Sequence, residues 1–448
     1  MFLLPCMVAL ALFAPQKKDK PQRPKPPPPP KAMLVLCTPT TIACDGGPAT
    51  ESVNSIAEAL TRSQPGTRIE LSSGDYQGIG IGYSKDAKWC AKTSGGTRER
   101  PVTVLGKGKA RIVGASDAIT VSQQIKNGFI TFENIELSPG YRSAVLFAQG
   151  DWVHEGYRFL NCDIIGHWNH LSDSDGESDD ASAHTSKWGV YGRGLKDFEF
   201  RGVGHPVRVV DLRREHAFYL QNLRGDVLIE NVDAARLGRT FVQLTAREKE
   251  GPPSVGQVTI RNCHVEDCCI AAGDNFKGGS AFTFAGRHTG TILLQKNSYR
   301  SGFVPALLAL TRQGIPYGTG ALVAWDGNEG DPTARLILED NDFQMAPGCG
   351  DRPLVAIGAC AQVEIRGKNR FVSGANPSAL ELEPTRESRP EGSPVGAIDI
   401  DPQTEIQGPI RRRGKELKLV DLLSEYPRIP APPAKDPGSG SEPPRKKP

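Results

Sequence analysis

The chain reads VTIRNCHVE from Val258 to Glu266, and this short stretch decides the fold. Two runs of strand-forming residues meet at Asn262. The same arrangement returns in residues 129–137, 157–165, 197–204, 227–234, 291–299, 336–343 and 363–371. The recurring slot holds Asn134, Asn161, Gly202, Asn231, Asn262, Asn297, Asn341 and Asn369.

Asn and Gly adopt the left-handed backbone conformation at low cost. A slot that holds only these two residue types predicts a one-residue corner between strands. We expect the corners to stack in one column with positive or bridge-region φ, and their amides to hydrogen-bond along the column as a ladder. The pattern predicts an all-β fold, a single right-handed parallel β-helix whose coils contact only their neighbours.

A second strand run precedes most corners and predicts the first strand of each coil. We align these runs on the inward residues Val190, Phe218, Val242, Phe282, Val323 and Val355. The next residue then points outward, which gives the column Tyr191, Tyr219, Gln243, Thr283 and Ala324. Two residues further on lie Arg193, Gln221, Thr245, Ala285 and Asp326. Extra residues flank this sheet, including 167–186 and 247–256, so we expect them to wall a binding groove along it.

The ends of the chain differ from its repetitive body. Residues 1–14 are apolar and resemble a secretory signal peptide, which predicts export, although a start site further along the chain is the alternative. Residues 15–37 form a Pro- and Lys-rich linker. The β-helix should span 38–410, entered through a short capping helix that begins after Ser55. Residues 411–448 should form a C-terminal cap and a disordered tail.

The net charge of +3 comes from the flanks, because the linker and the tail are basic and the body between them is acidic. This distribution argues against nucleic-acid binding by the folded part. A membrane contact is expected only through the N-terminal segment, if it is not cleaved. Among the ten cysteines, two pairs are candidates for disulfides, Cys37 with Cys44 and Cys349 with Cys360, while Cys162 and Cys263 should be small core residues.

The adjacent Cys268 and Cys269 suggest redox or metal chemistry, but no CxxC set accompanies them. A structural role is therefore the simpler interpretation for this pair.

Residues 55–76, SIAEALTRSQPGTRIELSSGDY, and 100–114, RPVTVLGKGKARIVG, resemble the first coils of right-handed parallel β-helix proteins of the pectin-lyase-like superfamily. The resemblance extends from about Ser52 to about Gly408. The first of these segments is similar to polysaccharide lyases that act on uronic-acid polymers such as alginate and dermatan-type glycans. The hydrolase motifs of the superfamily are mostly missing, since Gly204-His205-Pro206 is only a partial match to Gly-His-Gly.

A cleft with aromatic rings and guanidinium groups suits an anionic sugar chain. The predicted substrate-binding residues are Trp188, Tyr191, Arg193, Tyr219, Gln243 and Arg214. If the protein cleaves by β-elimination, Arg193 or Arg239 would neutralise the developing charge, and Tyr219 or Lys187 would act as the base. Hydrolysis is disfavoured, because Glu215 and Asp326 should lie too far apart for a pair of catalytic carboxylates.

An acidic loop contributes Asp173, Asp175, Glu177 and Asp179. Clustered carboxylates suit Ca²⁺, but their spacing does not match an EF-hand, and a solvated acidic loop is the alternative.

The leading hypothesis is an exported β-helix that binds an acidic polysaccharide and could cleave it by β-elimination. The rival is a non-catalytic structural or adhesive module at the cell surface.

Overall fold

The computed structural model describes residues 40–44, 51–82, 90–93, 95–122, 128–148, 150, 152–167, 188–212, 215–246, 251–269, 280–302, 320–324, 334–350, 352–385, 394–427 and 429. The chain divides into two units, Met1–Leu34 and Val35–Pro448, and every described residue belongs to the second. The predicted signal peptide and the linker up to residue 37 therefore lie outside the described residues. Within the described residues, no helix is long and apolar enough to cross a membrane.

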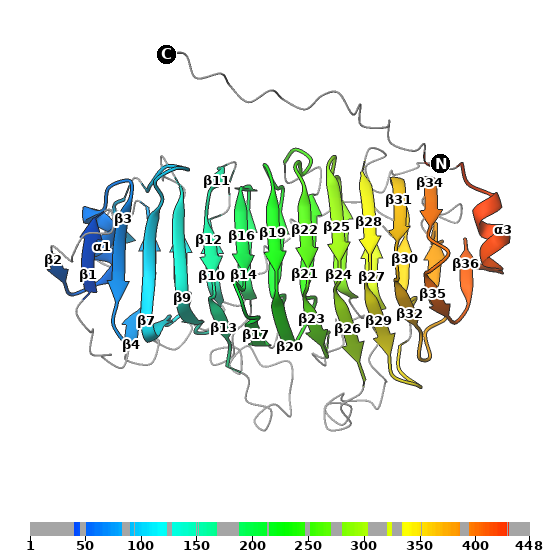
Figure 1. Ribbon diagram of the computed structural model, residues 1–448, viewed down its shortest axis with the longest axis horizontal. Coiled ribbons are helices and arrows are strands. Elements are labelled where there is room, and N and C mark those ends of the chain that lie inside the picture. Colours follow the sequence, from blue (N-terminus) through cyan, green and yellow to red (C-terminus); the bar gives the residue numbers. More distant parts are fainter. Residues whose placement is uncertain are drawn as a thin grey trace, which may run out of the picture. The chain divides into compact units, whose positions relative to one another are not determined.

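The second unit is an all-β parallel solenoid, as predicted. A typical coil has three strands, one on each of three faces, which we number 1 to 3. Face 1 is a 13-stranded sheet, and the strands of faces 2 and 3 belong to one 22-stranded sheet. Successive coils lie side by side in chain order, from β3 to β34 (Figure 1).

Face 1 consists of β5 (Ile79–Ile81), β6 (Cys90–Ala91), β8 (Ile119–Val121), β10 (Ser143–Phe147), β14 (Trp188–Arg193), β18 (Phe218–Gln221), β21 (Val242–Ala246), β24 (Ser280–Gly286), β27 (Gly320–Ala324), β30 (Val355–Ile357), β33 (Leu380–Leu382), β36 (Ile410–Arg412) and β37 (Lys415–Leu417). Face 2 consists of β3 (Thr67–Leu71), β7 (Val102–Val113), β9 (Ile130–Ser138), β12 (Arg158–Leu160), β16 (Phe198–Arg201), β19 (Val227–Glu230), β22 (Val258–Arg261), β25 (Thr291–Gln295), β28 (Arg335–Glu339), β31 (Cys360–Arg366) and β34 (Val395–Ile400). Face 3 consists of β4 (Gly74–Gln77), the later parts of β7 and β9, β13 (Asp163–Ile165), β17 (Val207–Leu212), β20 (Val232–Leu237), β23 (His264–Glu266), β26 (Ser298–Ser301), β29 (Asp342–Met345), β32 (Arg370–Val372) and β35 (Glu405–Gln407). A small separate sheet pairs β11 (His154–Glu155) with β15 (Leu195–Lys196).

The first coil is covered at its open end. Helix α1 (Ile56–Arg62) begins after Ser55, whose hydroxyl accepts a hydrogen bond from the backbone N–H of Glu58, as the capping pattern predicted. Its apolar side is buried against the solenoid. Strands β1 (Thr40–Cys44) and β2 (Glu51–Val53) add antiparallel pairs at the same end, so that the edge of β3 is not left open.

Inward residues of adjacent coils stack in apolar columns. On face 2, Phe132, Phe159 and Phe200 follow one another in register, with ring centroids 5.3 and 6.1 Å apart. The column continues with Ile229 and Ile260. All five side chains are fully buried, so each coil contributes one large group to a shared core.

The six cysteines whose side chains the structure describes are free thiols. Cys162 and Cys263 lie in the core, as predicted. The candidate disulfide between Cys349 and Cys360 is not formed, because both thiols are free. Cys37, from the other candidate pair, lies outside the described residues. Cys349 lies in the turn after β29, whereas Cys360 begins β31 on face 2, so closeness in sequence did not bring them to one corner.

The corner between faces 2 and 3 differs from the prediction. The residues of the recurring slot occupy two successive positions of the corner, and each position forms its own column along the solenoid. Positive φ occurs at the first corner residue, which is Asn134, Asn161, Asn231, Asn262, Lys296, Asp340 or Gly367 in the successive coils where the corner is tight. The next inward position holds Ile135, Cys162, Val232, Cys263, Asn297, Asn341 and Asn369. The expectation of one column was therefore wrong. A side chain that changes column also changes from solvent to core.

Gly202 departs from the pattern in another way. Its backbone N–H donates to Glu230 O, which places it in the first corner column, but its φ is not positive. Residues 203–206 lengthen this corner, and Gly204 takes positive φ instead. Asn161 Oδ1 accepts from the N–H of Val203, and Asn231 Nδ2 donates to Gly202 O, so the neighbouring amides secure the longer turn.

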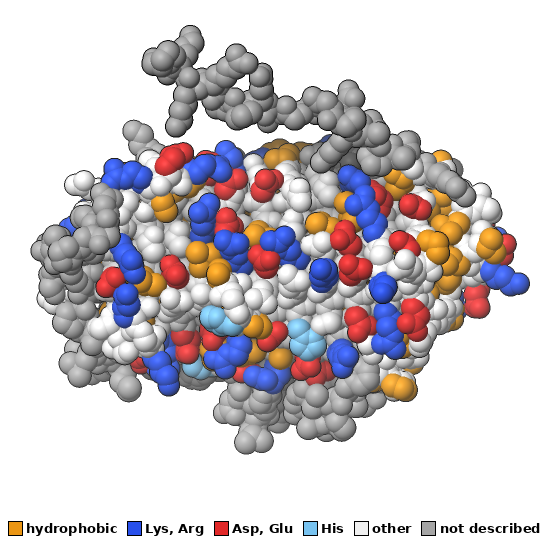
Figure 2. Space-filling model, viewed as in Figure 1, with side chains coloured by type: hydrophobic (Ala, Val, Ile, Leu, Met, Phe, Trp, Pro, Cys, Tyr) orange, Lys and Arg blue, Asp and Glu red, His pale blue; other side chains and the backbone are white. Residues whose placement is uncertain are grey.

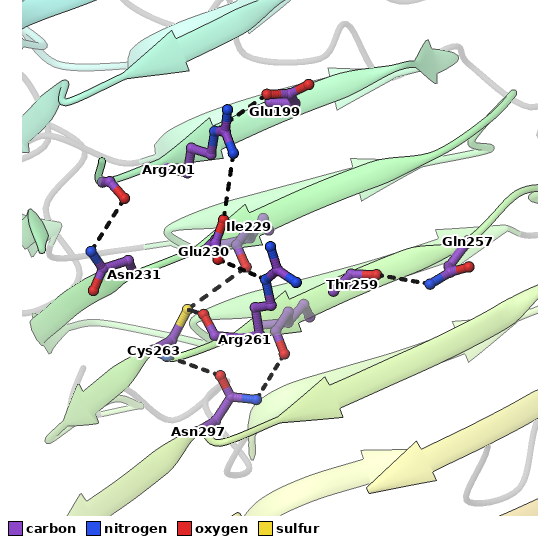
Figure 3. A network of polar contacts seen from close by, with 12 residues as sticks. Glu199, Arg201, Ile229, Glu230, Asn231, Gln257, Thr259, Arg261, Cys263 and Asn297 are labelled. Atoms are coloured by element: carbon purple, nitrogen blue, oxygen red, sulfur yellow. Dashed lines mark hydrogen bonds and ion pairs between the residues drawn. The ribbon is translucent and has the colours of Figure 1, made fainter. Parts of the chain in front are cut away.

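The predicted amide ladder exists in the last three positions only. Asn297 Nδ2 donates to Asn341 Oδ1, and Asn341 Nδ2 donates to Asn369 Oδ1, both at 3.1 Å. Each amide also donates to a backbone carbonyl, and Asn297 further accepts from the N–H of Cys263 (Figure 3). The three side chains are buried, so these bonds offset the cost of removing the amides from water.

The two columns should respond differently to the same substitution. Asn341→Gly removes a buried amide and leaves its partners in the ladder unsatisfied, so we expect the free energy of unfolding to fall by about 1–3 kcal/mol. Asn262→Gly keeps a residue suited to positive φ at an exposed corner, so it should change stability little. Urea unfolding of both variants measures the difference, and an equal effect at the two sites would refute the two-column assignment.

A buried carboxylate secures the C-terminal end. Glu383 has a 1% exposed side chain and accepts from Arg412 Nε at 2.9 Å and from Arg413 Nε at 2.8 Å. It also accepts from the N–H of Val395, while Arg412 packs over the ring of Tyr426. These contacts tie the β36–β37 hairpin and the segment after helix α3 (Leu419–Ser424) to the last coils.

The stability of this end should depend on pH. Burial alone would raise the pKa of Glu383, but hydrogen bonds from Arg412, Val395 and Arg413 outweigh it and lower the pKa. The contribution is therefore present above the ordinary carboxyl value of 4.5 and is lost as pH falls through the lowered value. We expect Glu383→Gln to lower the melting temperature at neutral pH and to differ less from the wild type at about pH 3. A difference that does not shrink in acid would contradict this account.

Candidate functional site

The outward column of face 1 follows from the pairing of its strands. Tyr191 pairs with Tyr219, Tyr219 with Gln243, and Gln243 with Thr283. All four side chains are partly exposed, as predicted. The next outward residue is Val323, because Leu322 pairs with Phe282.

At β27, the assignment of inward and outward residues from the sequence was wrong by one residue. It placed Val323 inward and Ala324 outward, yet Ala324 is fully buried. The run Ala321-Leu322-Val323-Ala324 is apolar throughout, so alternation alone could not assign its faces. Asp326, assigned to the next column, lies outside the described residues.

The alternation of inward and outward residues is interrupted at the start of β18, and this interruption places His216 on the outward side with Tyr219. The N–H groups of Ala217 and Phe218 donate to the consecutive carbonyls of Thr240 and Phe241, and both side chains are buried. Strict alternation therefore fails at this point, as it does in a β-bulge. The residue before the pair, His216, consequently lies against Tyr219 with ring centroids 5.0 Å apart.

Four rings form a continuous row on face 1. Trp188 stacks on Tyr191 at 5.3 Å and 18°, and Tyr191 stacks on Tyr219 at 5.3 Å and 7°. His216 completes what we call the ring row. Tyr side chains on a strand stand roughly perpendicular to the sheet, so the ring faces cover one another and the hydroxyl ends point outward. The row therefore offers hydroxyl groups and ring edges to a ligand rather than open ring faces.

His216 is buried and neutral. Burial lowers the pKa of its imidazole to about 3, and the positive charge of Arg239 adds to the effect. Its Nε2 lies 3.4 Å from Glu215 Oε2, and its Nδ1 has no hydrogen-bond partner in the described part of the chain. The ring is uncharged at neutral pH, so it does not form a salt bridge with Glu215. Its contact with Tyr219 is packing between the two rings.

Two arginines lie at the margins of the ring row. Arg239 Nη1 is 3.1 Å from Glu215 Oε2, and the backbone N–H of Arg239 donates to Glu215 O. Arg193 lies two residues after Tyr191, and its guanidinium reaches the loop at Gly251, where an added Cβ would be 3.2 Å from Nη2. The positive charges thus flank the uncharged column from both ends of the strands.

The described part of one predicted wall, residues 251–256, is hydrogen-bonded to the segment after β18. Asn222 Nδ2 donates to Pro252 O, and Ser254 Oγ accepts from the N–H of Leu223. Residues 251–256 therefore run beside the turn that follows β18. Of the other predicted wall, 167–186, residues 168–186 lie outside the described residues.

Several predicted site residues are not among the described residues. These are Lys187, Arg214, Asp173, Asp175, Glu177 and Asp179. The Ca²⁺ hypothesis for the acidic loop stays a prediction. Within the described ranges no group of His, Cys, Asp or Glu is arranged to hold a metal ion.

Sequence reasoning missed the link between Glu215, His216 and the ring row. His216 lies in the segment directly before β18. Sequence reasoning also passed over Tyr141 and Trp152, both 43% exposed, which flank the face 1 strand β10. Their position next to a first strand was the available signal.

The arrangement favours binding of polar or anionic groups. Tyrosine hydroxyls donate and accept hydrogen bonds, and guanidinium groups pair with carboxylate or sulfate. Hydrolysis of a glycoside needs two carboxylates across the bond. Glu215 is held by Arg239, so it is a poor member of such a pair.

Comparisons with known proteins add no assignment, since no family model, no curated protein and no solved structure matches this chain.

His216 should make stability fall in weak acid. Its folded pKa of about 3 lies below the ordinary 6.5, so between these values the unfolded chain binds a proton that the folded chain excludes. Stability should drop by about 1.4 kcal/mol per pH unit in this window from this residue. We expect His216→Gln to lose this dependence, measured as urea unfolding at about pH 7 and about pH 4.5. Parallel pH profiles for the two proteins would show that His216 is protonated without penalty.

Proposed function

We propose that this protein is an exported β-helix that binds an acidic polysaccharide along face 1, at the ring row. The supporting observation is the character of its outward column. Over four adjacent strands the column reads Tyr191, Tyr219, Gln243 and Thr283, with no charged side chain. Arg193 stands at one margin of the column, and Arg239 stands at the other in an ion pair with Glu215.

Face 2 makes a useful contrast, because its charges neutralise one another. Arg201 lies 3.4 Å from Glu199 and 3.7 Å from Glu230, and Arg261 lies 2.7 Å from Glu230 (Figure 3). The side of the molecule seen in Figure 2 likewise has basic and acidic side chains interspersed. An anionic polymer on face 2 would meet carboxylates on successive coils, whereas on face 1 it would meet an uncharged column with the ion pair Arg239–Glu215 at its margin, so face 1 is the better surface for it.

The chemistry of a uronic-acid polymer fits face 1. Each sugar offers hydroxyls to Tyr191, Tyr219 and Gln243, and its carboxylate can pair with a guanidinium group. Neighbouring strands are about 4.8 Å apart, so these groups repeat along the solenoid in the way that sugars repeat along a chain. The resemblance of the first coils to pectin-lyase-like proteins supports the same substrate class.

Cleavage would proceed by β-elimination. The proton next to the sugar carboxylate becomes removable when Arg193 or Arg239 neutralises the developing negative charge. Tyr219, beside the neutral His216, is the candidate base among the described residues. As a phenolate it would take this proton, while a carbon–carbon double bond forms, the bond to the glycosidic oxygen breaks and that oxygen takes a proton from water.

One observation favours the rival function, a structural or adhesive module. The ring faces of Tyr191 and Tyr219 are used on each other, which also stabilises neighbouring coils without any ligand. The two functions differ in whether the hydroxyl groups matter.

Binding of alginate, pectate and glycosaminoglycans, measured by calorimetry, tests the proposal. We expect Tyr219→Ala and Arg193→Ala to weaken binding of a uronic-acid polymer about tenfold each, which corresponds to about 1.4 kcal/mol. Tyr219→Phe should weaken it nearly as much, because the hydroxyl rather than the ring face meets the ligand. Arg239→Ala should have its larger effect at low salt, since exposed charge attraction is screened at high ionic strength.

Matched variants control for non-specific effects. Arg261→Ala removes an arginine from face 2 and should leave binding unchanged. Glu215→Gln should strengthen binding, because it releases Arg239 from its ion pair. Absorbance of unsaturated products, with and without Ca²⁺, reports elimination. Equal binding by all variants, or none by the wild type, would refute the proposal and support the structural module.

A further inference from the structure

Two adjacent thiols, those of Cys268 and Cys269, lie just after β23 and outside the ring row. Cys268 is fully buried, Cys269 is partly exposed, and their Sγ atoms are 3.8 Å apart in a thiol–thiol hydrogen bond. Cys269 has a φ of +61°, which is uncommon for a residue other than Gly, Asn or Asp. The pair is therefore held in contact in a strained turn and has no other sulfur partner in the described part of the chain.

The backbone of this pair contacts the candidate site. The N–H of Cys269 belongs to the peptide bond between the two cysteines, and it donates to the carbonyl oxygen of Arg239 at 3.0 Å. Arg239 in turn pairs with Glu215 next to the ring row. A change in the orientation of one peptide bond would thus reach the margin of face 1 directly.

We propose that Cys268 and Cys269 form a redox modification site, in which a small-molecule disulfide converts the two thiols to a vicinal disulfide and so detaches Arg239 from the 268–269 peptide.

The chemistry proceeds by two exchange steps. The thiolate of the exposed Cys269 attacks the small-molecule disulfide, forms a mixed disulfide and releases one small thiol. Cys268, whose Sγ lies 3.8 Å away, then attacks the Cys269 sulfur, forms the Cys268–Cys269 bond and breaks the mixed disulfide, and its proton goes to the departing sulfur, which leaves as the second small thiol. Two protein thiols are oxidised, and one disulfide is reduced to two thiols. Burial, then the contact with Cys269, raises the pKa of Cys268 well above its usual range, so Cys269 reacts first.

Ring strain makes the change reversible and structurally active. Adjacent Cα atoms are about 3.8 Å apart, closer than in an ordinary disulfide, and the ring contains the peptide bond itself. Closing the ring twists the 268–269 peptide away from its relaxed planar arrangement. The N–H of Cys269 then points in a new direction and no longer donates to the carbonyl oxygen of Arg239. Strained disulfides of this kind are the easily reduced ones, as a switch requires.

The test uses the full-length protein equilibrated with glutathione disulfide and then mapped by mass spectrometry. We expect the tryptic peptide 262–277 to lose two hydrogens, with fragment ions that place the bond between Cys268 and Cys269, and dithiothreitol should reverse it. Cys268→Ser should stop at a glutathione adduct on Cys269. Cys269→Ser should stay unmodified at the buried Cys268.

Circular dichroism establishes that the two variants fold. A persistent dithiol in excess glutathione disulfide would overturn the proposal. So would a bond from Cys269 to Cys349, the thiol that lies against Gly302 on a neighbouring coil.

Hydrogen exchange tests the coupling to Arg239. The N–H of Cys269 should exchange faster in the oxidised protein than in the reduced protein, while the N–H of Cys263 in the buried ladder should be unchanged. Equal exchange at Cys269 would refute the coupling. Any effect of oxidation on polysaccharide binding rests on the proposed function, whereas the mass and exchange measurements do not.

Discussion

The interaction on which the structure depends is the backbone pairing between successive coils. Each strand donates and accepts along its length with the same strand of the next coil, so neighbouring coils must turn at the same place. A coil that turned one residue early would move its whole inward set to the solvent side. The corner residues therefore carry more structural information than the strands between them.

The corner shows two physical solutions to one requirement. In the N-terminal coils the left-handed residue is an Asn that faces solvent or is half-buried, and the next residue is an apolar core residue such as Ile135 or Val232. In the C-terminal coils the left-handed residue is Lys296, Asp340 or Gly367, and the Asn has moved into the core. Buried amides cost desolvation unless they are satisfied, and three in succession satisfy one another. The same residue type thus serves backbone geometry in one half and side-chain hydrogen bonding in the other.

Faces 1 and 2 differ in the charge of their outward side chains. On face 2, acidic and basic residues alternate between coils and pair, and exposed pairs of this kind add little stability each. Face 1 carries an outward column that is uncharged from Tyr191 to Thr283, with arginines at the margins of the strands, and the strand starts are irregular there. That irregularity gathers Trp188, His216 and the two tyrosines on one side. The turn that holds Cys268 and Cys269 then contacts the same margin from face 3, so the site and the thiol pair share one hydrogen bond at Arg239.

The sequence by itself determined the parallel solenoid, the helix that caps its first coil and the face 1 register over Tyr191, Tyr219, Gln243 and Thr283, because these follow from period-two alternation and local capping. Only the tertiary structure decided where alternation fails. In the structure the Asn residues occupy two columns, Val323 rather than Ala324 faces outward, and His216 packs against Tyr219. These outcomes depend on which backbone groups the neighbouring coil offers, and a one-residue shift in that pairing leaves the residue pattern unchanged while it reverses which side chains reach water.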